Sequence, residues 1–275
     1  MSRPGRLLQH LPIPVYNPRD VSSPCPTCAH APPPGATTCP HCGTLLKGST
    51  LIMPHSSKGR PWFALRVVRT DGGREAVVEI AGDSLTCGKD GDLKLPDDPF
   101  VAAIQARFFF SGDKLAVEDV GGGNGVFLRV RDERELPPGG ELRVGRQRLV
   151  AESIPPRVPG PGGIEQWGSP DPGHRFRMVQ LLEGGIRASA FPLRDGTSLI
   201  GRETGDLTFR GDGFVSGRHA SLHVAGNRIS VRDLGSSNGT FVRLAGPVLV
   251  DGGDQLLVGR QLLRVERGTE DTIRR

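Results

Sequence analysis

The sequence predicts a mainly β protein in which two antiparallel β-sandwiches stand in tandem behind a small N-terminal metal-binding module. The chain of 275 residues contains 39 glycines and 24 prolines, and no stretch has the apolar spacing of an amphipathic helix. Short runs of alternating apolar and polar residues are separated by tight-turn signals such as Asp71-Gly72-Gly73 and Gly226-Asn227. The length suffices for two domains of ordinary size and a small appendage.

The first element is a group of four cysteines in two closely spaced pairs. Within each pair, two intervening residues let both sulfurs face inward, so four thiolates can approach one tetrahedral zinc ion. The spacing resembles that of a compact bacterial zinc ribbon, which we expect over residues 21–47, between a disordered N-terminus (1–20) and a linker (48–60). The predicted metal ligands are Cys25, Cys28, Cys39 and Cys42.

The zinc is expected to be structural, because four sulfur ligands leave no open position for water. Two disulfides are the alternative explanation of these cysteines. We favour zinc because the sequence shows no export signal, and a reducing compartment keeps thiols reduced. The residues of the ribbon do not identify what it binds. Protein docking or a purely structural role is favoured over nucleic-acid binding, because the nearby basic residues are scattered and Tyr16 is the only aromatic residue before Trp62.

An internal repeat defines the rest of the chain. The segment from Trp62 to Glu152 aligns with the segment from Phe176 to Glu266, so both are expected to adopt one fold. Among the matching blocks, Leu-Arg-Val-Gly-Arg-Gln at residues 142–147 corresponds to Leu-Leu-Val-Gly-Arg-Gln at residues 256–261. Repeated short strands joined by tight turns predict antiparallel sandwiches whose loops gather at the ends.

These matches predict the domain boundaries. We expect one sandwich over residues 61–153 and a second over residues 174–268. Residues 154–173 are rich in proline and glycine and are expected to be a linker between the two domains. Residues 269–275 are expected to form a tail.

Charge is distributed unevenly between the repeats. Residues 61–153 contain 13 basic and 16 acidic residues, a net charge of −3, whereas residues 174–268 contain 13 and 9, a net charge of +4. Only the second repeat therefore favours anionic partners. No apolar run approaches the roughly 18 residues of a membrane span, so we expect a cytoplasmic protein without membrane contact.

The second repeat carries three polar clusters between its short apolar runs. They are Gly201-Arg202, Ser216-Gly217-Arg218-His219 and Ser236-Ser237-Asn238-Gly239-Thr240-Phe241. A guanidinium, a hydroxyl and a carboxamide can converge on one anion if the strands return these turns to one end of a sheet, and an arginine fork matches phosphate oxygens. The set resembles the FHA (forkhead-associated) domain, a β-sandwich module that binds phosphothreonine peptides, over roughly residues 176–267.

The resemblance implies a role for each residue of these clusters. Arg202 would grip the phosphate, and Ser216 would hydrogen-bond one of its oxygens. Arg218 would add charge, and Asn238 would bond the peptide backbone beside the phosphothreonine. The remaining implied residues are Gly217 and Ser237 in the peptide-binding set, with Gly201, His219 and Gly239 supporting the site; His219 would brace the loop from beneath.

The first repeat lacks this phosphate chemistry. Lys89 stands in place of Arg202 and has no bidentate fork, and Ala102 in place of Ser216 has no hydroxyl. Ile104 and Gln105 replace the arginine and the bracing histidine. We therefore expect a degenerate FHA-like domain that does not bind phosphate. Three roles are open for this domain: it would pack against the second sandwich, bind a protein through another face, or act as a spacer.

These observations predict a non-enzymatic adaptor in Ser/Thr kinase signalling. Its partners would be phosphothreonine-containing proteins, a Ser/Thr kinase or its substrates. The alternatives are a phosphate-independent scaffold and a nucleic-acid-associated regulator that acts through the ribbon. An enzyme is not supported, because no second catalytic group accompanies Ser216 or His219 and no glycine-rich nucleotide loop opens a helix.

Overall fold

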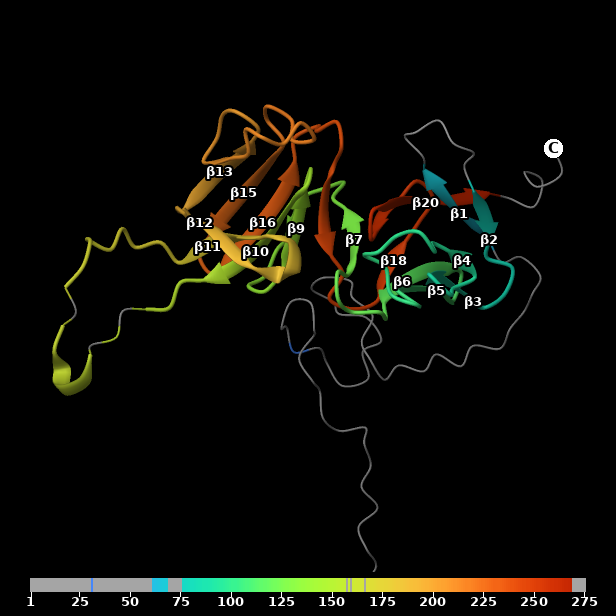
Figure 1. The fold of residues 1–275 in the computed structure, drawn as a ribbon, viewed down its shortest axis with the longest axis horizontal. Coiled ribbons are helices and arrows are strands. Elements are labelled where there is room, and N and C mark those ends of the chain that lie inside the picture. Colours follow the sequence, from blue (N-terminus) through green and yellow to red (C-terminus); the bar gives the residue numbers. More distant parts are fainter. Residues whose placement is uncertain are drawn as a thin grey trace, which may run out of the picture.

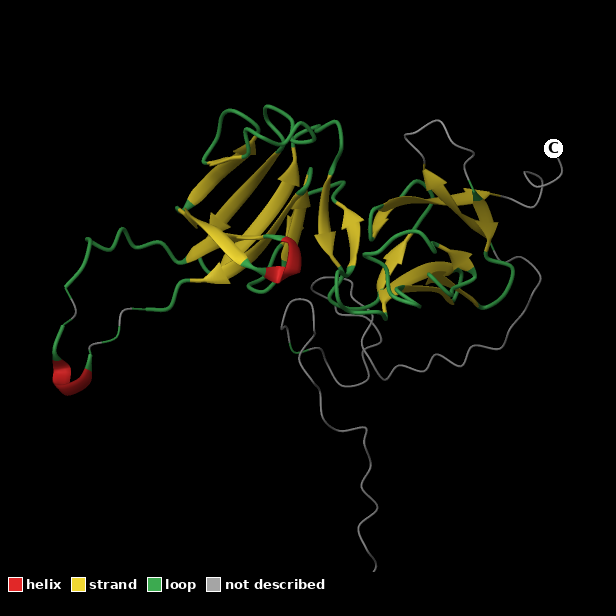
Figure 2. Cartoon of the chain, in the orientation of Figure 1, coloured by secondary structure: helices red, strands yellow, loops and turns green. Residues whose placement is uncertain are grey.

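The structure is a computed structural model that describes residues 61–68, 76–156, 158, 160–165 and 167–268, together with Ala31. In these parts the chain consists of twenty short strands and two single-turn 3₁₀ helices, η1 (Pro161–Gly163) and η2 (Glu183–Gly185) (Figure 2). The expected mainly β class is confirmed. Among the described residues, none belongs to a helix long and apolar enough to span a bilayer.

Each repeat contributes ten strands in the same order. The strands of the first repeat are β1 (Trp62–Val68), β2 (Val77–Glu79), β3 (Ser84–Gly88), β4 (Leu93–Lys94), β5 (Ala106–Ser111), β6 (Lys114–Asp119), β7 (Val126–Arg129), β8 (Arg134–Glu135), β9 (Glu141–Val144) and β10 (Gln147–Ser153). Burial alternates with period two in some strands of both repeats, such as β9 and β15 (Ala220–Ala225), where Ala220, Leu222 and Val224 face the core.

The strands of the second repeat follow in the corresponding order. They are β11 (Phe176–Leu181), β12 (Arg187–Leu193), β13 (Gly196–Gly201), β14 (Leu207–Thr208), β15, β16 (Arg228–Asp233), β17 (Thr240–Arg243), β18 (Val248–Val250), β19 (Gln255–Val258) and β20 (Gln261–Gly268). One ten-stranded sheet runs through both halves of the molecule in the order β12-β11-β10-β9-β17-β7-β19-β20-β1-β2 (Figure 1). Two five-stranded sheets, β14-β13-β15-β16-β8 and β18-β6-β5-β3-β4, complete the two sandwiches.

The two repeats exchange their last three strands. β8, β9 and β10 of the first repeat pair with β16, β17 and β11 of the second repeat. In return, β18, β19 and β20 pair with β6, β7 and β1. We call the unit formed by residues 62–128 and 244–268 sandwich A, and the unit formed by residues 129–243 sandwich B. Each has its own apolar core, and each core draws side chains from both repeats.

The crossing occurs where β7 and β17 lie side by side at the middle of the ten-stranded sheet. They pair antiparallel around Leu128 and Val242. Beyond each strand the chain continues straight into the other sandwich: the Val130 amide donates to the Thr240 carbonyl, and the Leu244 amide donates to the Val126 carbonyl, both at 2.8 Å. Neither strand turns back on its own repeat, which is why the exchange arises.

This arrangement differs from the expected boundaries at residues 61–153 and 174–268. Residues 154–173 do not connect two separate domains. They form a long loop between β10 and β11, which are neighbours in sandwich B, and the Ile154 amide closes the base of this loop by donating to the Arg175 carbonyl at 2.8 Å. The loop projects from the molecule (Figure 1), and Trp167 within it is fully exposed.

Several expectations fall on residues outside the described part of the chain. These are the N-terminus at 1–20, the zinc ribbon at 21–47 with its four cysteine ligands, the linker at 48–60 and the tail at 269–275. Within the described residues, the one cysteine is Cys87. It is buried in the core of sandwich A, and this burial raises the pKa of its thiol to about 12.

Candidate functional site

The three polar clusters of the second repeat lie at one rim of sandwich B. β13 and β16 end at this rim, and β15 and β17 begin there, because neighbouring strands of these pairs run antiparallel. The loops after Gly201, before Ala220 and before Thr240 therefore meet at the top of the left-hand unit in Figure 1. We call this loop cluster rim B, with residues 201–206, 209–219 and 234–239.

Main-chain and side-chain hydrogen bonds join the three loops of rim B. The Arg202 amide donates to the Ser216 carbonyl at 3.0 Å, and the Ser237 amide donates to Ser216 Oγ at 3.2 Å. Asn238 Nδ2 donates to the Phe214 carbonyl at 2.9 Å. The side chains of Ser237 and Asn238 are exposed, and that of Arg202 is 40 % exposed. The structure thus brings Arg202, Ser216 and Asn238 into one accessible cluster.

The Arg202 guanidinium is only loosely held. Its Nε lies 3.3 Å from a carboxylate oxygen of Glu203, whose side chain is 68 % exposed. An exposed ion pair of this kind contributes little to stability and is easily replaced by another anion. Gly217 and Arg218 are also exposed on the loop that precedes β15.

Glycine is required at two positions of rim B. A Cβ at Gly201 would overlap the carbonyl oxygens of Gly217 and Thr204, so the loops approach each other closely only without a side chain there. Gly239 has a φ of +81°, and a Cβ there would lie 2.6 Å from Arg129 Nε. Both positions therefore require glycine for the loops to adopt this geometry.

His219 braces rim B from beneath. Its side chain is fully buried; Nδ1 accepts a hydrogen bond from the Ser216 amide at 3.0 Å, and Nε2 lies 3.0 Å from the Gly239 carbonyl. This pair of bonds requires the neutral imidazole, with the proton on Nε2. Burial lowers the pKa of His219 and outweighs the Gly239 carbonyl, which favours the charged ring.

Asp233 fixes the loop that carries Ser237 and Asn238. Its carboxylate accepts from the amides of Gly235 and Ser236 and from the hydroxyls of Ser236 and Thr240, at 2.6–2.9 Å. Burial alone would raise the pKa of Asp233, but these hydrogen bonds hold it below the usual value. The loop is therefore anchored by a carboxylate that stays charged.

The first repeat contributes to rim B, which the sequence did not indicate. The Asp212 carboxylate accepts from the Arg146 amide at 2.8 Å and from Gln147 Nε2 at 2.7 Å, so the turn between β9 and β10 is fastened to the loop that holds Ser216. The Arg146 guanidinium stacks 4.6 Å from the centre of the Phe214 ring. The only sequence signal was that Gly-Arg-Gln occurs in both repeats, and this does not reveal which copy each sandwich uses.

Sandwich A has an equivalent rim formed by the loops around Gly88, Phe100 and Asn124. The Lys89 amide donates to the Ala102 carbonyl at 3.0 Å, and Asn124 Nδ2 donates to the Phe100 carbonyl at 3.1 Å, as their counterparts do in rim B. A Cβ at Gly88 would overlap the Ala103 carbonyl. The loop framework is thus retained, while the serine and arginine side chains are replaced.

Gln105 takes over the role of the buried histidine in sandwich A. Its Oε1 accepts from the Ala102 amide at 3.2 Å, and its Nε2 donates to Asp119 Oδ1 at 2.8 Å and to the Gly122 carbonyl at 3.0 Å. The sequence showed only that the histidine is replaced, and the structure shows that the brace itself is kept. A carboxamide offers one acceptor and one donor group, as a neutral imidazole does, and it cannot be protonated near neutral pH.

Comparison with known proteins assigns this part of the second repeat to a family. Residues 198–259 match the model of the FHA domain. By sequence, this segment is similar to FHA domains. The matched FHA segment begins in β13 and ends after β19, so it passes through the crossing: its last strands lie in sandwich A and its polar clusters in sandwich B.

The FHA domain is shared with two mycobacterial proteins. The FHA domain-containing protein FhaB of Mycobacterium tuberculosis is 35 % identical over 69 residues, which are 25 % of this chain and 44 % of that protein. FhaB of Mycolicibacterium smegmatis is 30 % identical over 95 residues, which are 34 % of this chain and 61 % of that protein. The chain therefore spans about half the length of these relatives.

Solved FHA structures align with part of the chain. One comes from a structural and functional analysis of phosphothreonine-dependent FHA domain interactions; it is 28 % identical, has a TM-score of 0.21 and covers 33 % of this chain and 95 % of its own. The FHA domain of the CT664 protein from Chlamydia trachomatis is 20 % identical, with a TM-score of 0.20, and covers 34 % of this chain and 99 % of its own.

Proposed function

We propose that the protein is a phosphothreonine-dependent adaptor that binds its phosphorylated partner at rim B. The observation that carries this proposal is that Arg202, Ser216 and Asn238 lie in one exposed loop cluster that the buried His219 supports. The FHA match over residues 198–259 supports the same function. The partner would be a Ser/Thr kinase or one of its substrates.

The hydrogen bonds within rim B leave the groups that a phosphopeptide needs. Ser216 Oγ already accepts from the Ser237 amide, so its hydroxyl proton remains to be donated to a phosphate oxygen. Asn238 uses one amide proton on Phe214, which leaves its second proton and its Oδ1 for the peptide backbone. The terminal nitrogens of Arg202 would donate to two phosphate oxygens as a bidentate fork.

The energetic contrast between phosphorylated and plain threonine is large. The phosphate has a charge of about −1.5 to −2 at neutral pH and three acceptor oxygens, which an unmodified hydroxyl lacks. Two or three charge-assisted hydrogen bonds of about 1.5–3 kcal/mol each account for much of the roughly 8 kcal/mol of a micromolar complex. Phosphorylation would therefore act as the switch for binding.

Fluorescence anisotropy with matched phosphothreonine and threonine peptides from an oriented library tests this function. We expect binding of the phosphorylated peptides alone and loss of that binding in Arg202→Ala. Lys89→Ala, at the equivalent place in sandwich A, is the matched control and should bind as the unchanged protein does. Equal affinity for both peptide forms would refute the adaptor function and favour a phosphate-independent scaffold.

We also propose that Cys25, Cys28, Cys39 and Cys42 hold one structural zinc ion and that the protein acts in the cytoplasm without catalysis. The supporting observation is the spacing of the four cysteines, since four sulfurs fill a tetrahedral site. Elemental analysis of the purified protein should give one zinc per chain, and Cys25→Ser with Cys28→Ser should remove it. Retention of zinc by that variant would contradict the assignment.

A further inference from the structure

A trough of about 860 Å³ runs along the ten-stranded sheet on the face turned away from the two cores. Its floor includes Arg143 and Arg148 on β9 and β10, whose neighbours Leu142 and Leu149 point into the core of sandwich B. One wall comes from sandwich A and the other from the turn at η2. The volume lies toward the upper end of the range for ligand pockets, about 300–1,000 Å³.

Four arginines give the trough its charge. Arg143, Arg146, Arg148 and Arg260 line it, against a single lining carboxylate, that of Glu183. Arg148 is paired with Glu141 at 2.6 Å. Arg146 and Arg260 are exposed, and within the described residues neither guanidinium has a carboxylate at ion-pair distance. Two cationic groups are therefore available to an anionic ligand.

The buried part of the trough also favours an anionic ligand. Arg143 lies over the Phe127 ring at 5.6 Å, and its Nη1 donates to the Gly259 carbonyl at 3.0 Å. Desolvation lowers the pKa of Arg143, and the nearby charge of Arg148 acts in the same direction. An anion placed beside these two arginines would relieve their repulsion in a partly desolvated place.

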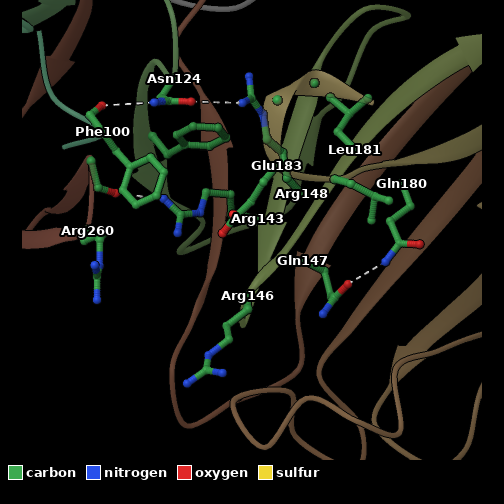
Figure 3. A pocket seen from close by; sticks show the side chains of 15 residues that line it. Phe100, Asn124, Arg143, Arg146, Gln147, Arg148, Gln180, Leu181, Glu183 and Arg260 are labelled. Atoms are coloured by element: carbon green, nitrogen blue, oxygen red, sulfur yellow. Dashed lines mark hydrogen bonds between the residues drawn. The ribbon is translucent and has the colours of Figure 1, made fainter. Parts of the chain in front are cut away.

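One end of the trough lies next to rim B. Its lining residue Arg146 stacks on the Phe214 ring at 4.6 Å, and the carbonyl of the same Phe214 accepts the hydrogen bond from Asn238. Figure 3 shows Arg146 extending away from Arg148 and Asn124. The Arg146 amide donates to Asp212 of rim B, so Arg146 lies at the end of the trough next to rim B. A peptide that continues from rim B toward the trough would therefore meet Arg146 first.

The rest of the lining suits a polypeptide. Gln147 and Gln180 are hydrogen-bonded to each other at 2.8 Å, and Asn124 lies between the Phe100 carbonyl and Arg148 (Figure 3). Side-chain amides of this kind can bond peptide N–H and C=O groups. Phe100 is the exposed aromatic ring among the lining residues, whereas single-stranded nucleic acids need several stacking rings.

We propose that the trough binds an acidic segment that flanks the phosphothreonine in the partner protein. The inference rests on the proposed function of rim B and adds a sequence preference to it. It also gives the first repeat a role, since Arg143, Arg146 and Arg148 come from that repeat although they lie in sandwich B.

Anisotropy titrations of the full chain with three phosphothreonine peptides test the proposal. One peptide has four Asp/Glu residues on the N-terminal side, one has them on the C-terminal side, and the third has Asn/Gln at all these places. We expect one acidic peptide to bind about tenfold more tightly than the neutral peptide, with a steeper loss of affinity as salt is added. In Arg146→Gln/Arg260→Gln this ratio should fall toward one.

Arg228→Gln is the matched control, because Arg228 is the exposed first residue of β16, at the end of sandwich B opposite rim B. It should leave the ratio unchanged, and thermal melting should show both variants folded. Equal binding of acidic and neutral phosphopeptides would overturn the trough proposal while leaving the proposed function intact. A ratio that survives in the double variant, or an oligonucleotide that binds the trough arginines in place of the peptide, would overturn it as well.

A different result would refute the proposed function of rim B. In that case no peptide shows a difference between phosphothreonine and threonine, and Arg202→Ala changes nothing. An acidic effect that persists without phosphate and disappears in Arg146→Gln/Arg260→Gln would support the trough and refute the phosphate site.

Discussion

His219 and Gln105 solve the same local problem with different chemistry. Each side chain accepts a hydrogen bond from the backbone amide three residues earlier, and each donates to the following loop of its own rim. The imidazole does this only in its neutral form, whereas the carboxamide does so at any pH near neutrality. The stability of rim B should therefore depend on pH in a way that the rim of sandwich A does not.

The substitution His219→Gln tests this dependence. Because burial lowers the pKa of His219 in the folded state, protonation favours the unfolded chain, whose histidine has a pKa of about 6.5. The stabilising contribution of His219 is complete above pH 6.5 and is lost as the pH falls from there toward the lower folded pKa. Urea unfolding between pH 7.5 and 5 should show this loss in the unchanged protein and a smaller one in His219→Gln.

His219→Ala provides the reference for that experiment. It leaves the Ser216 amide and the Gly239 carbonyl without partners, so unfolding free energy should fall by about 1–3 kcal/mol per unsatisfied group already at pH 7.5. If His219→Gln is as unstable as His219→Ala at that pH, the equivalence of the two braces is wrong.

Gly201→Ala is the second prediction at this scale. The new methyl group would overlap the Gly217 and Thr204 carbonyls, and backbone cannot move as easily as a side-chain end, so we expect a loss of about 1–3 kcal/mol and weaker phosphopeptide binding. Gly211→Ala is the control, because nothing lies within 4 Å of its Cβ position. Chemical denaturation of both variants would show whether only the first is destabilised.

The meeting of Arg202, Ser216 and Asn238 at one rim was the part of the candidate site that the sequence predicted best. Arg202, Ser216 and Asn238 came from motif resemblance, and their meeting at one rim followed from antiparallel strands. The role of Gln105 was not predicted. Its sequence position shows only that a histidine is replaced, while the bonds that replace the imidazole depend on where Asp119 and Gly122 lie in space.

At the level of elements, two buried aspartates fasten the exchanged strands to the loop clusters. Asp212 holds the β9–β10 turn of the first repeat through the Arg146 amide, and Asp98 holds the β19–β20 turn of the second repeat through the Arg260 amide. Each also accepts the amide of a loop phenylalanine, Phe214 or Phe100, at 3.0 Å. Each carboxylate therefore holds a strand turn of one repeat against a loop of the other repeat.

This symmetry gives a matched pair of substitutions. Asp212→Ala and Asp98→Ala should each lower the unfolding free energy by about 1.5–3 kcal/mol, the contribution of hydrogen bonds to a charged group. Only Asp212→Ala should weaken phosphopeptide binding, on the order of tenfold, because its carboxylate positions the loop of Ser216. Calorimetric melting and peptide anisotropy measure the two effects, and equal binding losses in both variants would contradict the assignment.

On the scale of the whole molecule, the exchange of three strands decides which residues form one folding unit. The sequence could not show it. Residues 142–147 and 256–261 present nearly the same pattern, so the sequence does not distinguish which copy completes which sandwich. The choice depends on whether the chain turns back after β7 and β17 or continues straight, as it does here.

A chain that ends at Arg243 separates the two arrangements. It lacks β18, β19 and β20, whose pairings lie with β6, β7 and β1, so sandwich A should unfold and sandwich B should keep its core. Hydrogen exchange should therefore show lasting protection within residues 129–243 and its loss within residues 62–128. Phosphopeptide binding should persist.

A fragment of residues 174–268, which is the second repeat alone, is the control for that truncation. It contains the whole FHA match but lacks β9 and β10, which lie between β17 and β11 in the ten-stranded sheet, and β8, which pairs with β16 in the other sheet of sandwich B. We expect it to be poorly folded and unable to bind. The opposite pattern, with an active 174–268 fragment and an inactive truncated chain, would mean that each repeat folds on itself.

The long loop of residues 154–173 leaves sandwich B after β10 and re-enters it at β11. Cutting the peptide backbone there would not release two independent proteins, since each product would still have three strands embedded in the other. A protease that reaches this loop would therefore leave a non-covalent heterodimer, which comes apart only when both sandwiches melt.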